Sequence, residues 1–284
     1  MAYYYEEEKG WKRYGEGVIP VIILLLIAIV LIGKTTPTFC SVPVMNQFLC
    51  TRTGEVKIGV IGTLSGGDTK IGAEKLQEIL DTQGTAYSIY YTPVPLSVLQ
   101  YPREKMLKDF DLVIVSGVQN LTYAQRDAIG EYLKAGGNVI LIGDAATTDP
   151  NDPLVRGWSP ASFGDQVPVE LEPEASQSGD ITKNLTEANL IFWGTHPVLH
   201  DYAERYKLNL SEVACDNIKV VKVKNKEGNI IALLQGTGED NKEDNALAIV
   251  EGSGMFGGKI LYFNYDPGCT RGIAFASIRY LAGR

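Results

Sequence analysis

The sequence predicts an α/β domain, built on a parallel sheet flanked by helices with antiparallel strands added late, preceded by one transmembrane helix. Three observations carry this prediction. An uncharged apolar segment, Val18–Gly33, lies near the N-terminus; short apolar strands then alternate with helical stretches over residues 55–142; and strand pairs follow after about Thr195. Strands that alternate with helices at this spacing indicate βαβ units and hence a parallel sheet.

The apolar segment has the composition of a membrane-spanning helix. As a helix, Val18–Gly33 would be roughly 24 Å long, slightly shorter than a hydrocarbon core of about 30 Å. A cleaved secretory signal is the alternative, but no Ala-x-Ala-like site follows the segment. Residues 1–17 contain three basic residues, whereas only Lys34 closely follows the segment. The positive-inside rule therefore places 1–17 in the cytoplasm and the rest of a single-pass chain outside it.

Charge and location indicate the expected partners. The net charge is −8, with 26 basic and 34 acidic residues, and no basic stripe is present. This balance argues against nucleic acid, whose phosphates require clustered basic side chains. The lipid bilayer and other envelope or membrane proteins are the expected partners, and a homo-oligomer is compatible with the sequence.

The four cysteines all follow the apolar segment, as expected for a domain in an oxidising compartment. Cys40 with Cys50 would close a small loop, and Cys215 with Cys269 would connect the late strands; other pairings, or free buried cysteines, stay open. No C-x-x-C spacing is present, so no zinc site is predicted. Three N-x-S/T sequons permit glycosylation, at Asn120, Asn184 and Asn209.

The first part of the domain follows a stalk. Residues 34–54 contain prolines and hydroxyl residues without a clear period. Glu55–Gly62 is predicted as the first strand, and a Gly-rich turn leads from it into a helix that ends near Gln83. Thr85–Tyr91 is rich in strand-forming residues, and a weaker helical pattern covers Ser97–Asp109.

The next unit is a strand, a helix and a strand. Asp111–Ser116 is an unbroken apolar run, typical of a strand that is buried on both faces. Thr122 is a natural N-cap, because Gln125 three residues later completes a capping box. The helix that begins there is expected to end at Ala135, and Asn138–Ile142 is the fourth predicted strand.

The pattern changes after the fourth strand. Residues 143–195 are rich in Pro, Asp, Glu and Ser, which predicts a long irregular segment. Asn217–Lys224 and Asn229–Gln235 are predicted to form a hairpin, and Leu247–Gly252 and Lys259–Asn264 a second strand pair. The apolar spacing of Gly272–Ala282 predicts a C-terminal helix.

This order of elements resembles the class I glutamine amidotransferase-like superfamily, whose fold is a flavodoxin-like α/β sheet. The resemblance covers about residues 55–284, which it implies are one domain. Val115–Gly117 resembles the oxyanion-loop region of the family. Leu141–Thr147 occupies the place of the strand and elbow that carry the nucleophilic Cys, and Phe263–Gly268 resembles the Phe-His-Pro-Glu segment that supplies the His and Glu of the triad.

The departures from the family pattern imply that the reaction is absent. Ala145 stands in the place of the Cys, Asp266 in the place of the His and Gly268 in the place of the Glu. Acyl transfer needs a nucleophile, a base and a group that orients the base, and an alanine methyl cannot attack a carbonyl. The resemblance thus implies a non-enzymatic domain without a cofactor. Because ligands bind at the carboxyl ends of parallel strands, Gly117, Asp144, Ala145 and Asp266 form the candidate ligand pocket.

Metal chemistry has weak support. His196 and His200 have the spacing of a ligand pair, but Pro197 between them favours a structural turn before a helix. Acidic residues could also converge on a divalent cation, although acidic loops are common outside cells: Asp144, Asp149, Asp152, Asp165 and Asp266. No metal site is predicted.

The preferred hypothesis is a membrane-anchored, extracytoplasmic, non-catalytic binding or scaffold subunit. The first alternative is an envelope hydrolase that uses Asp144 and Asp266 for acid–base work. The second is a pilin-like or coat filament subunit, because Gly17–Ile22 and the apolar run after it resemble the hydrophobic segment of archaeal type IV pilins. In that family a basic pair usually precedes the Gly, whereas here Glu16 does.

Overall fold

A computed structural model describes residues 56–62, 89–100, 107–159, 161–202, 204, 207, 209–210, 213–254 and 257–283. All of them belong to one compact unit, Arg52–Arg284. The predicted cytoplasmic tail, transmembrane helix and stalk, and the helix that ends near Gln83, lie outside the described residues. Within the described part of the chain, no helix is both long and apolar enough to cross a bilayer.

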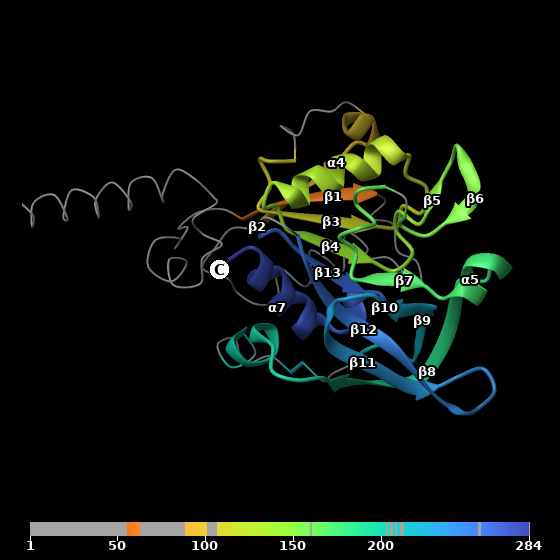
Figure 1. Ribbon diagram of the computed structural model, residues 1–284. Coiled ribbons are helices and arrows are strands. Elements are labelled where there is room, and N and C mark those ends of the chain that lie inside the picture. Colours follow the sequence, from red (N-terminus) through yellow and green to blue (C-terminus); the bar gives the residue numbers. More distant parts are fainter. Residues whose placement is uncertain are drawn as a thin grey trace, which may run out of the picture. The chain divides into compact units, whose positions relative to one another are not determined.

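A nine-stranded mixed sheet forms the centre of this unit (Figure 1). One half is parallel and has the order β2-β1-β3-β4-β13, with every neighbouring pair parallel. The first strand therefore lies between the second and third, which is the flavodoxin-like order. The bounds are β1 Val56–Gly62, β2 Ile89–Val94, β3 Leu112–Ser116, β4 Val139–Ile142 and β13 Lys259–Phe263.

The other half of the sheet is antiparallel and continues in the order β12-β11-β8-β9. Its strands are β8 Thr182–Phe192, β9 Asn217–Val221, β11 Asn229–Thr237 and β12 Glu243–Ser253. The predicted hairpin between β9 and β11 is wrong, because β8 lies between them and pairs with both. Leu234 of β11 pairs with Leu190 of β8, and Leu185 of β8 pairs with Ile218 of β9.

The segment 143–195, predicted to be irregular, contains several elements. A small antiparallel pair, β5 Thr148–Asp149 and β6 Asp152–Arg156, projects from the sheet, and helix α5 is Pro173–Ser178. A second pair joins β7 Val169–Leu171 to β10 Val223–Asn225. The predicted strand Asn217–Lys224 is therefore interrupted at Lys222, where the chain passes from the nine-stranded sheet to the β7–β10 pair.

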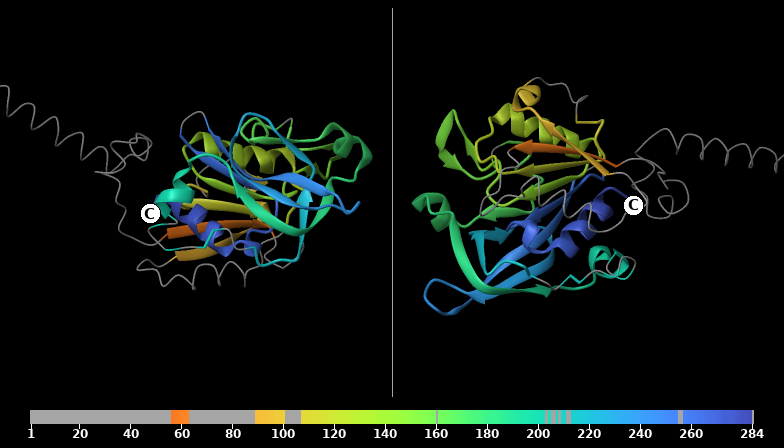
Figure 2. Two further views of the ribbon diagram at one scale, coloured as in Figure 1. Left: turned by 90° about the horizontal axis from the view of Figure 1, so that it is seen from below. Right: turned by 180° about the vertical axis from the view of Figure 1, so that it is seen from behind.

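Two helices cover opposite faces of the sheet (Figure 2). Helix α4, Tyr123–Lys134, begins with the predicted capping box, in which Thr122 Oγ1 accepts from Gln125 N and the Gln125 side chain accepts from Thr122 N. Helix α7 is Arg271–Leu281, close to the prediction. Buried residues of α4 pack with one face of β3 and β4 and those of α7 with the other, so these strands are covered on both sides.

The region of the weaker predicted helix differs from the prediction. Within Ser97–Asp109 the structure describes a 3-10 helix, η2 Leu96–Gln100, and a turn at 107–109, whereas residues 101–106 lie outside the description. The second strand ends three residues later than predicted, at Val94.

A buried ion pair joins α4 to the β5–β6 pair. Arg126 Nη2 lies 3.5 Å from Asp149 Oδ2, and both side chains are fully buried. Arg126 also donates to the backbone carbonyls of Leu121 and Gly157, at 3.1 Å each. Asp149 is thus turned into the core, so this member of the acidic set that could have bound a cation has a structural partner instead.

Candidate functional site

The predicted pocket residues follow strands that end at the same edge of the sheet. Strands β3, β4 and β13 are parallel neighbours, so the residues just after them share the carboxyl edge. Gly143 N donates to Phe263 O at 2.7 Å and continues the β4–β13 ladder beyond the strands. Gly117 follows β3 with a left-handed backbone (φ 64°), which glycine adopts without strain.

Ala145, which aligns with the nucleophile of the superfamily that the sequence resembles, is enclosed. Ala145 is 0% exposed and packs in the apolar cluster on the α4 side of the sheet. Its carbonyl accepts a 2.9 Å hydrogen bond from Trp158 Nε1. Trp158 is itself 3% exposed and packs edge-on against Tyr262, with ring centroids 5.6 Å apart. Trp158 of the 143–195 segment therefore packs in the same cluster as Ala145 and is hydrogen-bonded to its backbone.

The sharp turn after β4 contains a residue with a strained backbone but an unreactive side chain. Ala146 has φ 61°, unusual for a residue with a Cβ, and its N–H donates to Val118 O at 2.7 Å. Strain of this kind clusters at functional sites. Here the strained residue is a buried alanine, so the turn retains an elbow-like shape while offering only a methyl group.

The segment that resembles the family's His and Glu region is a structural turn. Asp266 caps the short 3-10 helix η4, Pro267–Cys269, because its Oδ1 accepts from Gly268 N at 2.7 Å. Cys269 forms a disulfide with Cys215. This predicted pairing is confirmed, whereas Cys40 and Cys50 lie outside the described residues.

Asp144 lies at the same edge in a more polar setting. Its Oδ2 accepts from Gln119 Nε2 at 3.2 Å. Burial, and then the nearby Asp144 carboxylate, raise the pKa of Tyr262 well above its usual 10.0. Asp266, the partner that the hydrolase alternative requires, is only 4% exposed and caps η4. It is therefore poorly placed to exchange a proton with a substrate.

The histidines do not form a ligand pair. Val198 N–H donates to His196 Nδ1 at 3.2 Å, so the ring proton lies on Nε2, which donates to Glu251 Oε2 at 3.1 Å. With both nitrogens of the buried His196 occupied, only the exposed His200 is left. His196–Leu199 forms the predicted turn, and the following π-helix, η3, is Val198–Tyr202. Among the described residues, no group of three or more His, Cys, Asp or Glu side chains could hold a metal ion.

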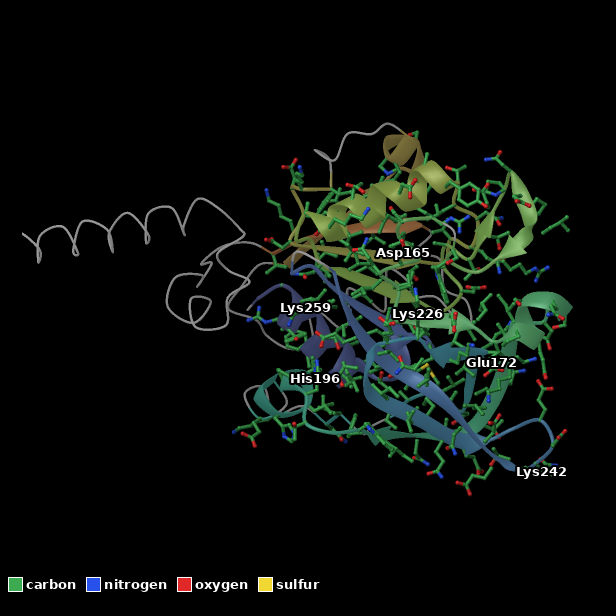
Figure 3. All side chains as sticks on the ribbon, viewed as in Figure 1. Asp165, Glu172, His196, Lys226, Lys242 and Lys259 are labelled. Atoms are coloured by element: carbon green, nitrogen blue, oxygen red, sulfur yellow. A yellow bond between two sulfur atoms is a disulfide. The ribbon has the colours of Figure 1, made fainter. Side chains whose placement is uncertain are left out.

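Glu251 is the centre of a partly buried polar cluster that links α7 to the sheet. Tyr280 Oη donates to its Oε1 at 2.8 Å, and Lys259 Nζ lies 3.7 Å from the same oxygen. Burial alone would raise the pKa of Glu251, but the His196 hydrogen bond, the Lys259 charge and the Tyr280 hydroxyl outweigh it and lower that pKa below 4.5. Figure 3 labels His196 and Lys259 beside α7.

A cleft of about 200 Å³ lies elsewhere, on the antiparallel half of the sheet. Leu233 of β11 and Leu247 of β12 line its apolar side. Four polar side chains also line it, among them Glu172 at the start of α5 (Figure 3): Glu172, Lys183, Lys222 and Asn245. The cleft lies where the chain passes between β9 and β10, a crossing that the strand pattern does not predict.

The wall of this cleft is fixed by Asn264, the residue after β13. Its Oδ1 accepts from Val221 N at 2.8 Å, and its Nδ2 donates to the carbonyls of Val221 and Leu247 at 3.0 and 2.8 Å. This buried amide therefore satisfies both backbone groups of Val221 at the end of β9. The side chain acts as a substitute strand neighbour between β9 and β12.

The three sequon asparagines, Asn120, Asn184 and Asn209, are exposed. Asn184 lies on β8 and its amide donates to Glu239 Oε1 at 3.4 Å. Glycosylation of these residues stays a prediction.

No protein-family model matches the sequence, and no curated protein matches it. Among solved structures, a β-galactosidase from Rahnella sp. R3 is similar over 80% of this chain and 31% of that chain, with 13% identity and a TM-score of 0.51. A ThuA-like protein from Bacteroides uniformis is similar over 81% of this chain and 93% of that one, with 14% identity and a TM-score of 0.49.

These likenesses show the fold alone. The first supports the α/β architecture, a large mixed sheet with few helices. This chain spans about a third of the length of that β-galactosidase. The described part of the chain is thus an α/β domain with a flavodoxin-like parallel half, and what it does has to be argued from its own residues.

Proposed function

We propose that this chain is a non-catalytic binding or scaffold subunit with an amidotransferase-like domain, held outside the cytoplasm by a single membrane helix. The observation that carries the proposal is the construction of the carboxyl edge. The residue that aligns with the nucleophile is a buried alanine whose carbonyl accepts from Trp158, and the residue that aligns with the base is an aspartate that caps a disulfide-linked turn. Both positions therefore hold residues with structural roles in place of a nucleophile and a base.

The disulfide supports the location. Disulfides persist in oxidising compartments and are rare in the cytosol. Cys269 is 5% exposed and paired with Cys215, so the domain matches an extracytoplasmic environment. The uncharged segment Val18–Gly33 has the composition of an anchor and a length slightly short of the hydrocarbon core, and its basic flank agrees with this orientation.

Membrane fractionation and protease accessibility test this location together. The full chain should remain with membranes after alkaline carbonate extraction, and protease added outside intact cells should degrade the domain. Arginines at Leu25 and Ile27 should release the chain, because each charge at a helix centre costs about 2.5–3.5 kcal/mol on insertion. Arginine at Leu154, which is 90% exposed in the domain, is the matched control and should leave the chain in the membrane. Extraction of the unmodified chain by carbonate, or protection of the domain from protease, would contradict the proposal.

A further inference from the structure

The open face of the antiparallel half-sheet carries two ordered rows of side chains. Ile191, Leu233 and Leu247 pair in register across β8, β11 and β12 and form an aliphatic row. The next row on the same face consists of amides, Asn189, Gln235 and Asn245. Because residues two apart on a strand share a face, both rows lie on the side of the sheet where Leu233, Leu247 and Asn245 line the cleft.

An exposed tryptophan extends the aliphatic row. Trp193 follows Ile191 by two residues, just after the end of β8, where its N–H still donates to Ile231 O of β11 at 2.8 Å. Its side chain is 60% exposed and that of Ile191 is 38% exposed, while the intervening Phe192 is partly buried. In the described part of the chain, Leu154 is the only other large hydrophobic residue so exposed. Exposed apolar groups grouped on one face mark a contact surface.

The two lysines that line the cleft are each paired with an aspartate. Lys183 Nζ lies 2.7 Å from Asp244 Oδ2 and 3.2 Å from the Asn245 carbonyl. Lys222 Nζ lies 2.8 Å from Asp180 Oδ2. Each lysine therefore has its own aspartate, and the cleft offers oriented hydrogen-bonding groups without an excess of positive charge.

We infer that this face and its cleft bind a neutral oligosaccharide, an inference that rests on the proposed binding function and names its ligand class. Sugars present hydroxyl groups, which both donate and accept, beside apolar C–H faces. Each Asn or Gln amide also donates and accepts, so the amide row matches the hydroxyls. Gln235 donates to the Glu243 carboxylate and Asn189 to the Glu187 carbonyl, and an amide group with two N–H donors and an acceptor oxygen keeps further capacity for a ligand. Trp193 and Ile191 match the C–H faces, as a large amphipathic ring and an aliphatic neighbour. The paired lysines disfavour a ligand that relies on its own negative charge.

Titration of the full chain with defined oligosaccharides tests the inference. The chain is held in a detergent without a sugar headgroup, and the probes are maltohexaose, cellohexaose and mannohexaose, with oligogalacturonate of equal length as the acidic comparison. At least one neutral sugar should bind, as measured by calorimetry and by tryptophan fluorescence. The chain has three tryptophans, and Trp158 is buried, so loss of the fluorescence change in Trp193→Phe identifies the reporter.

Substitutions in the aliphatic row and in the amide row test which side chains bind the sugar. Trp193→Ala should weaken binding about tenfold, and Asn245→Ala about fivefold. Leu154→Ala, an equally drastic truncation of an exposed residue away from this face, should leave affinity unchanged. The inference is overturned if no neutral sugar binds, if oligogalacturonate binds equally well, or if neither Trp193→Ala nor Asn245→Ala weakens the affinity for the sugar. A negative result here leaves the fractionation result intact, so failure of the ligand class is distinguishable from failure of the proposed function.

Discussion

Replacing Arg126 with methionine is expected to lower the free energy of unfolding by about 3–5 kcal/mol, because removal of one partner leaves a buried charge uncompensated. Asp149 would remain fully buried without its cation, and two backbone carbonyls would lose their donor. Asp149→Asn should cost a similar amount for the converse reason. Chemical denaturation of the full chain and both variants, followed by near-ultraviolet circular dichroism, measures the effect.

A surface pair on the same helix is the matched control. Lys134 and Glu131 form a 2.8 Å ion pair in which both side chains are about half exposed. Glu131→Gln should therefore leave the free energy of unfolding nearly unchanged. If Arg126→Met is no more harmful than Glu131→Gln, the buried pair does not join α4 to the β5–β6 pair as described.

The same pair sets a pH dependence. Burial alone would raise the pKa of Asp149, but the backbone N–H groups of Asn151 and Tyr123 and the Arg126 charge outweigh burial and lower that pKa below 3.8. A lowered folded-state pKa contributes stability that is full above the unfolded pKa and is lost as the pH falls through the folded one. Below about pH 3.8 the unmodified chain should therefore lose stability more steeply than Asp149→Asn.

Removal of the Cys215–Cys269 disulfide is expected to cost about 4 kcal/mol, because the bond constrains a long loop in the unfolded chain. The two cysteines are 54 residues apart in sequence. The bond also holds η4 to the segment before β9, where Ala214 N donates to Cys269 O at 2.7 Å. Thermal unfolding of Cys215→Ala/Cys269→Ala against the unmodified chain measures the loss.

Reduction provides the control for this variant. A reducing agent should destabilise the unmodified chain by at least as much as the double substitution does. The double variant lacks this disulfide, so reduction should not shift its thermal unfolding through this bond. If the double variant unfolds within about 1 kcal/mol of the unmodified chain, the loop-closure argument for this disulfide is contradicted.

The parallel half of the fold was predictable because its signals are local. The apolar runs of β3 and β4 are buried on both faces, so no alternation had to be recognised. The capping box at Thr122 and Gln125 defines the start of α4 within one turn. The Cys215–Cys269 pair was one of few possibilities for four cysteines.

The antiparallel half was less predictable because its signals are interrupted. In β8 the buried residues Leu185, Ala188 and Leu190 do not keep a period of two, since Glu187 has φ 51° and the register with β11 shifts nearby. In the sequence, the polar residues of β8 therefore resembled those of a loop. The crossing at Lys222 is hidden in the same way, because β9 and β10 form one continuous pattern in sequence while pairing with different strands.

The candidate site was likewise predictable only where its signals are local in the sequence. Gly117, Asp144, Ala145 and Asp266 could be placed at one edge from strand order alone. Trp158 above Ala145 could not be predicted, because the contact joins the end of β4 to a segment with no recognisable period. The cleft and the rows through Trp193 and Asn245 depend on register between β8, β11 and β12, which no single sequence segment contains.

The reactivity of a cysteine introduced at Ala145 tests most directly whether the nucleophile position is closed. In the folded full chain, Ala145→Cys should react with a neutral alkylating reagent on the order of 100-fold more slowly than Ser159→Cys, because a buried thiol is both inaccessible and hard to ionise. Ser159 is an exposed neighbour of Trp158, and labelling of the unmodified chain gives the background. Slow modification of Ala145→Cys supports the proposed binding domain, in which this position is closed. Equal rates for the two cysteines would show an open pocket at this position and contradict the account.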